Sequence, residues 1–72
     1  MKDEKETTFL QRLSIEEAIL GDKIYSLNKV LNEDGFAKKV GAYQFELLAL
    51  QHTAMVMYRR ILNMRISDLT KP

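Results

Sequence analysis

The C-terminal half of the chain carries two apolar rows at helical spacing, and these rows limit what the chain can fold into. Residues three and four apart share one face of a helix, so each row predicts an apolar stripe. The first row is Val40, Tyr43, Leu47, Leu50, Ala54, Met57, Ile61 and Met64, and the second row is Phe45, Leu48, His52, Met55, Arg59, Leu62 and Ile66. A helix with two such rows needs two partners, and a short chain supplies only one of them.

The N-terminal half carries one row of the same kind. It consists of Leu10, Leu13, Glu17, Leu20, Ile24, Leu27 and Leu31. Thr8 or, as an alternative start, Ser14 offers an N-terminal cap. Gly21 lies off the row and costs roughly 1 kcal/mol of helix propensity, which the continuous row outweighs. The expected helix therefore spans about residues 8–32.

The turn between the two expected helices lies at Asn32–Gly35. Because this connection is short, the second helix must return antiparallel to the first. The second helix is expected at about residues 37–66, with a start at Ala37 or, if Gly41 marks a late start, at Ala42. The predicted fold class is all-α: an antiparallel two-helix hairpin that assembles into a homo-oligomeric helical bundle.

The hairpin is expected to pack the N-terminal row against the first row of the second helix. A fold at Gly35 would then place Glu17 near Ala54. The second row stays free in this arrangement, as the surface through which the chain meets another molecule. The expected domain organisation is a disordered leader at residues 1–7, the hairpin domain at 8–66 and a polar tail at 67–72.

Composition excludes several classes of protein. The 72 residues contain no cysteine and one histidine, which argues against disulfides and against a zinc site. A chain this short needs help to be stable, and oligomerisation is the aid that remains. The formal charge of +1 argues against a duplex DNA binder. No apolar run reaches the roughly 18 residues of a membrane span, so we expect a soluble, intracellular protein. We expect no cofactor.

The sequence offers no catalytic arrangement. Glu17 lies on the N-terminal row, which is expected to face the second helix. There it would pair with a cation and set the register of the two helices, or else contact a ligand such as a ribose hydroxyl. Glu16 points about 100° away from Glu17 on a helix, so the two do not form a carboxylate pair. His52 has no serine or cysteine at helical spacing to activate. We therefore expect a binding protein and no enzyme.

Cations gather around one tyrosine near the C-terminus. Tyr58, Arg59, Arg60 and Arg65 lie there, with Lys23 and Arg12 opposite on the first helix. A phenol beside guanidinium groups can stack a purine and hold a phosphate. A solvated basic end that balances the helix dipole is an equally natural interpretation. Residue chemistry alone leaves these two interpretations open.

A longer pattern resembles a known group of proteins. Its positions include Leu47, Leu48, Gln51, Ala54, Met55, Tyr58, Ile61, Leu62, Arg65 and Ile66, with Arg12, Leu13, Glu16, Leu20, Lys23, Ile24, Leu27, Leu31 and Phe36 in the first half. This pattern, over about residues 11–66, resembles small helical-hairpin proteins of tailed phages, including crAss-like phages. Any helical hairpin supplies the apolar positions, so the polar ones carry the resemblance. Gly21 and His52 depart from it.

By analogy, these phage proteins are similar to the anti-CBASS and anti-Thoeris sponges, which are small helical oligomers. The resemblance implies a homo-oligomer in the cytoplasm of an infected bacterium. It would sequester a cyclic nucleotide or cyclic ADP-ribose-type second messenger without hydrolysing it. The ligand-binding residues implied are Arg65, Tyr58, Arg59, Gln51, Lys23 and Arg12. Two alternatives stay open: a module that docks a host or phage helix through its second row, and a small nucleic-acid-binding accessory protein, which the near-zero charge disfavours.

Overall fold

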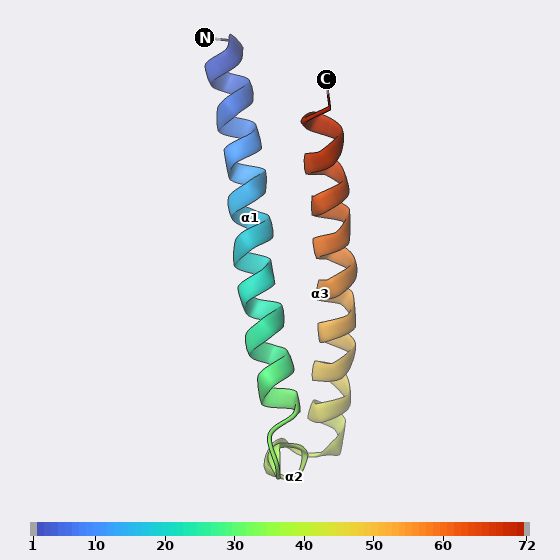
Figure 1. Cartoon of the computed structure of the whole chain (residues 1–72). Helices are drawn as coiled ribbons and strands as arrows, with labels where there is room; N and C mark the ends of the chain where they lie inside the picture. The colour runs from blue at the N-terminus through green and yellow to red at the C-terminus, as the bar shows by residue number, and fades with distance from the viewer. Residues whose placement is uncertain (1, 72) are drawn as a thin grey trace.

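The computed structural model describes residues 2–71, with side chains from Thr8 to Lys71. It contains three helices, α1 (Lys2–Leu31), α2 (Phe36–Val40) and α3 (Ala42–Leu69), and no strand within the described residues. The long helices α1 and α3 run antiparallel side by side, with both chain ends at the same end of the molecule (Figure 1). The all-helical class expected from the sequence is confirmed.

The helix bounds differ in part from the expected ones. α3 continues past Ile66 to Leu69, so the first residues of the predicted polar tail are helical. α1 is assigned from Lys2. The predicted leader, residues 1–7, lies outside the residues whose side chains the structure describes, and stays a prediction.

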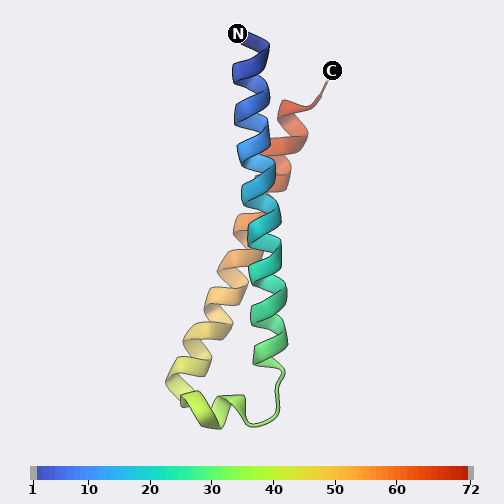
Figure 2. The ribbon, with the colours of Figure 1, turned by 90° about the vertical axis from the view of Figure 1, so that its left-hand side faces the viewer.

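Two glycines shape the connection between the long helices. Gly35 (φ 79°) precedes α2 and Gly41 (φ 94°) follows it, both in a backbone region that other residues rarely adopt. The second expected helix is therefore divided at Gly41, and the long part begins at Ala42. Figure 2 shows that α1 and α3 cross at an angle and that α2 bridges their diverging ends. Phe36 on α2 lies against Phe45 on α3, with ring centroids 6.3 Å apart.

The core lies between α1 and α3 and is small. Leu62 is fully buried, and Leu13 and Leu20 of α1 are 4% and 7% exposed. Ile24, Met55 and Ile66 pack against this cluster. On α3 the core therefore consists of second-row residues, whereas the N-terminal row supplies the α1 side as expected.

The prediction that the first row of α3 packs against α1 was wrong. The first row lies largely in solvent: Leu50 is 61% exposed and Met64 62%. The reason is electrostatic, because Glu17 on the α1 row needs a cation opposite it, and only the second row supplies one. The Arg59 Nε donates to Glu17 Oε2 at 2.7 Å. The free surface for another molecule is accordingly the first row.

The register also differs from the expected one. Glu17 lies opposite Arg59 and not near Ala54. α2 and its two flanking glycines occupy the connection, so the chain does not fold back tightly at Gly35. The whole of α3 is displaced along α1 as a result.

Candidate ligand-binding grooves

A groove between α1 and α3 brings together three of the predicted ligand-binding residues. It has a volume of about 410 Å³, and we call it the tyrosine groove. Its lining consists of Arg12, Ile15, Glu16, Ile19, Leu20, Lys23 and Tyr58. All but Tyr58 come from α1, where residues three and four apart share a face.

The tyrosine groove combines cationic and apolar surface. Arg12 and Lys23 are exposed, and neither forms an ion pair with any described residue. Ile15 and Ile19 are 58% and 50% exposed between them, and Tyr58 presents a half-exposed phenol from α3. Guanidinium and ammonium groups bind phosphate, whereas a phenol and two isoleucines suit the face of a base.

A second groove adjoins the first through Lys23, which lines both. It is more apolar and lies toward α2. Its lining consists of Asp22, Lys23, Ser26, Leu27, Val30, Phe36, Leu48, Gln51 and Met55. Gln51, another predicted ligand-binding residue, is therefore placed next to the tyrosine groove and shares a cation with it.

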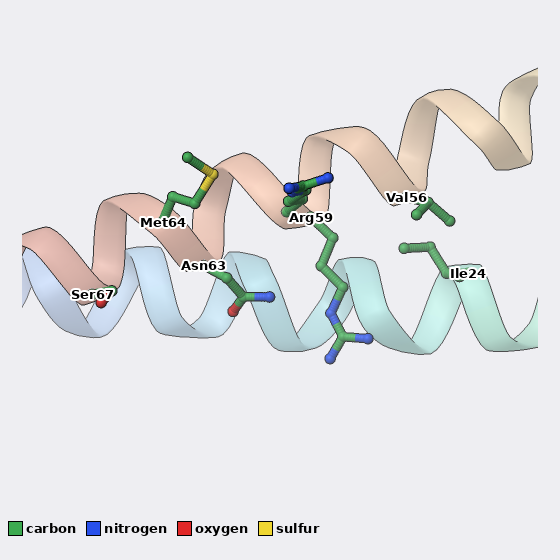
Figure 3. Close-up of a pocket in the computed structure, with 7 residues that line it drawn as sticks. Ile24, Val56, Arg59, Asn63, Met64 and Ser67 are labelled. Carbon is green, nitrogen blue, oxygen red and sulfur yellow. The ribbon is translucent and has the colours of Figure 1, made fainter.

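A third groove is lined by Arg59, the cationic member of the charged pair that joins the two helices. Its lining consists of Ile24, Val56, Arg59, Arg60, Asn63, Met64 and Ser67. Figure 3 shows Arg59 reaching from α3 across α1, while Val56 and Ile24 face each other beside it. The Arg59 side chain is 42% exposed and that of Glu17 is 18% exposed. Arg59 thus pairs with Glu17, and pairing with a cation is one of the two roles that the sequence left open for Glu17.

The guanidinium of Arg59 explains the glycine in the middle of α1. A Cβ atom added to Gly21 would lie 2.6 Å from the Arg59 Cζ and from one of its terminal nitrogens. Gly21 is one helical turn from Glu17, so the guanidinium passes over the glycine to reach the carboxylate. In the sequence, the signal for the contact between Arg59 and Gly21 was a glycine inside a helix, one turn after the acidic residue of the N-terminal row.

Gly21→Ala tests this explanation, because its effect on stability should change sign when Arg59 is removed. In the wild-type chain the new methyl group displaces the guanidinium, so we expect stability to fall although alanine is the better helix former. With Arg59→Ala already present, Gly21→Ala should stabilise by about 1 kcal/mol, the ordinary propensity gain. Urea denaturation at one protein concentration measures both effects. If Gly21→Ala stabilised the protein equally with and without Arg59, the close approach of the Arg59 guanidinium to Gly21 would not affect stability.

Comparison with known families decides the classification. A family model described as Sequestin matches residues 7–68, nearly the whole chain. The chain belongs to the Sequestin family. The family's name denotes sequestration of a ligand, which is a binding activity and not a catalytic one. No curated protein and no solved structure matches the chain.

In this Sequestin-family chain the predicted ligand-binding residues lie in four different places. Arg12, Lys23 and Tyr58 share the tyrosine groove, and Gln51 lies in the adjoining one. Arg59 lies in the third groove, bound to Glu17, and exposed Arg65 lines none of the three. The residues that sequence reasoning missed are Ile15 and Ile19. Ile15 and Ile19 lie one helical turn apart and outside the N-terminal row, so their spacing in the sequence was a signal for an exposed apolar patch on α1.

Other features of the described residues limit the chemistry. No group of three or more histidine, cysteine, aspartate or glutamate residues in residues 8–71 could hold a metal ion. In the same part of the chain, no helix has the length and apolar character needed to cross a membrane. His52 is half-buried on α3.

Proposed function

We propose that this Sequestin-family protein binds a phosphorylated purine second messenger and holds it without converting it. A cyclic nucleotide or a cyclic ADP-ribose derivative is the ligand class. Such a protein would act as a phage anti-defence sponge that silences CBASS or Thoeris signalling in an infected bacterium. The observation that carries the proposal is the convergence of Arg12, Lys23 and Tyr58 on one groove.

The groove residues match the parts of such a ligand. Arg12 can bind a phosphate through two parallel hydrogen bonds, and Lys23 supplies a second point charge. Tyr58 and the exposed isoleucines offer a face for the purine, for which stacking contributes roughly 1–3 kcal/mol per base. Glu16 can accept hydrogen bonds from ribose hydroxyls or an exocyclic amine. One acid against two cations leaves the groove with a net positive charge for a phosphodiester.

Retention without turnover fits the same residues. The lining of the tyrosine groove contains no serine, cysteine or histidine that could form a nucleophile–base pair. The groove is also open to solvent, whereas small-molecule sites usually enclose most of the ligand surface. A single chain therefore covers one side of a messenger. Homo-oligomerisation supplies the other side in this proposal.

Isothermal titration calorimetry tests the proposed binding. The panel comprises cyclic di-AMP, cyclic GMP–AMP, a cyclic trinucleotide and cyclic ADP-ribose. Losing one charge-assisted contact costs roughly 1.5–3 kcal/mol, so Arg12→Gln should weaken binding by about ten- to a hundredfold. Tyr58→Ala should lose the stacking term, whereas Tyr58→Phe should keep most of it. Lys38→Gln on α2, an exposed cation outside the three grooves, is the matched control and should bind like wild type.

Two results would count against the sponge. Absence of binding across the whole panel would remove the proposed ligand class. Chemically altered ligand after denaturing the complex would show turnover, which sequestration excludes. Intact ligand together with weakened Arg12→Gln binding is the expected outcome.

A further inference from the structure

Among the described residues, most of the exposed large apolar side chains of α3 lie on its first row. Six of its large side chains are at least 39% exposed along the helix: Tyr43, Leu47, Leu50, Met57, Ile61 and Met64. α1 contacts α3 through the second row, so among the described residues the first row is left largely uncovered. Between residues 47 and 64 this row contains no charged side chain.

We propose that a second copy of this chain covers the first row, with the two α3 helices antiparallel about a two-fold axis. The axis passes between Ala54 and Met57, and the tyrosine grooves of both copies open into one shared trough. The interface stands on its own observations. The shared trough rests on the proposed function, because it is where one messenger would bind per two chains.

The row is complementary to itself in this orientation. Pairing Ala54 with Met57 of the partner subunit sets small against large at the centre. The same register pairs Leu50 with the partner's Ile61, and Leu47 with the partner's Met64. Every apolar position from 47 to 64 thereby finds an apolar position opposite it. A parallel pairing would instead set Ala54 against itself and leave a gap.

The row supplies most of the area that a stable dimer buries. A large apolar side chain presents roughly 150–200 Å² when fully exposed, so the six side chains of this row offer about 500–670 Å² per copy at the observed exposures. Stable interfaces bury about 800 Å² per partner. Edge contacts that flank the row supply the remainder.

The two-fold axis also fixes where the ligand residues go. Gln51, Tyr58 and Arg65 are spaced by seven, so they share one edge of the row, the edge facing the tyrosine groove. An axis perpendicular to α3 places this edge of both copies on the same side. Tyr58 of one copy then lies within a turn of the partner's Gln51. Arg65, which lines no groove of the single chain, takes a place at each end of the trough.

Cysteine cross-linking tests the orientation, and the cysteine-free sequence makes the readout clean. Leu50→Cys and Ile61→Cys chains are prepared separately and mixed before oxidation or treatment with a short bis-maleimide. We expect the mixed 50–61 product and little product from either variant alone. Homodimeric 50–50 and 61–61 products would show a parallel pairing and overturn the proposal.

Light scattering and sedimentation test the interface without introduced thiols. Ile61→Glu should raise the dimer dissociation constant by about a hundredfold or more, because the symmetric dimer loses two buried contacts. Val56→Glu, at a slightly less exposed apolar position of α3 outside the first row, should leave the dimer dissociation constant unchanged. Circular dichroism reports whether each variant stays helical. A wild-type monomer at micromolar concentration, or an equal effect of both variants, would refute the interface.

Calorimetric stoichiometry tests the shared trough, with cyclic di-AMP and cyclic ADP-ribose as probes. We expect one ligand per two chains and loss of binding in Ile61→Glu but not in Val56→Glu. One ligand per chain, bound equally well by the Ile61→Glu monomer, would overturn the shared trough. If neither probe binds while the mixed cross-link forms, the proposed function fails and the interface stands.

Discussion

Leu62→Ala is expected to lower the free energy of unfolding by about 2–5 kcal/mol, the range for a fully buried leucine. Leu62 is the one described residue with no exposed surface, and it packs with Leu13 and Leu20 at the centre of a three-residue core. A protein of this size has few other apolar contacts to fall back on. The substitution should therefore remove most of the folded population at 37 °C.

Thermal and urea unfolding followed by circular dichroism measure this effect. Val56→Ala is the matched control, because Val56 is on the same helix but 44% exposed, and it should change stability by less than about 1 kcal/mol. Protein concentration must be held constant, because association shifts apparent stability. Equal destabilisation by both variants would place the core elsewhere. The same burial makes Leu62 unsuitable as a probe of self-association, for which the first row is the target.

Arg59→Leu should cost roughly 1.5–3 kcal/mol by removing the charge-assisted hydrogen bond to Glu17. The smaller figure applies if solvent screens the half-exposed guanidinium. The cost arises because Glu17, only 18% exposed, is left in the seam without its cation. Glu17→Leu should cost less, since the remaining Arg59 can turn toward water.

The double variant separates a charged pair from simple packing. With Glu17→Leu and Arg59→Leu together, the N-terminal row of α1 and the second row of α3 both lose their charged residue. No charge is left unpaired between the helices, so most of the stability should return. A double-mutant cycle by urea denaturation gives the coupling energy. Additive losses would show that the two side chains act independently. Loss of a single register in the double variant, seen as broadened amide spectra, would confirm that the pair selects the alignment of the helices.

The helical class and the core of α1 follow from the sequence by itself. The N-terminal row is periodic over seven positions, and Leu13 and Leu20 of that row are buried in the structure. The position of the connection was also readable, because Gly35 and Gly41 are the two described residues with positive φ, but the sequence did not show the separate helix α2 between them. Local spacing and backbone conformation depend on near neighbours in the chain, which a single sequence displays.

The candidate site was predictable only in part. Arg12, Lys23 and Tyr58 were all named from their chemistry, and they do share a groove. Arg59 was grouped with them because it follows Tyr58 in the chain. Adjacent helical residues point about 100° apart, so Arg59 turns instead to the other side of α3 and binds Glu17. Sequence proximity to a site residue therefore carried no information about side-chain direction.

The choice between the two rows of α3 belonged to the tertiary structure. Both rows are apolar and of similar length, so burying either one against α1 would gain a comparable hydrophobic free energy. The second row differs from the first in that it forms one ion pair with α1, between Glu17 and Arg59, which are 42 positions apart in the chain. The missing Cβ atom of Gly21 leaves room for the Arg59 guanidinium. Periodicity reports which residues share a face of one helix. Which faces meet depends on contacts between distant residues, and only the assembled pair of helices contains them.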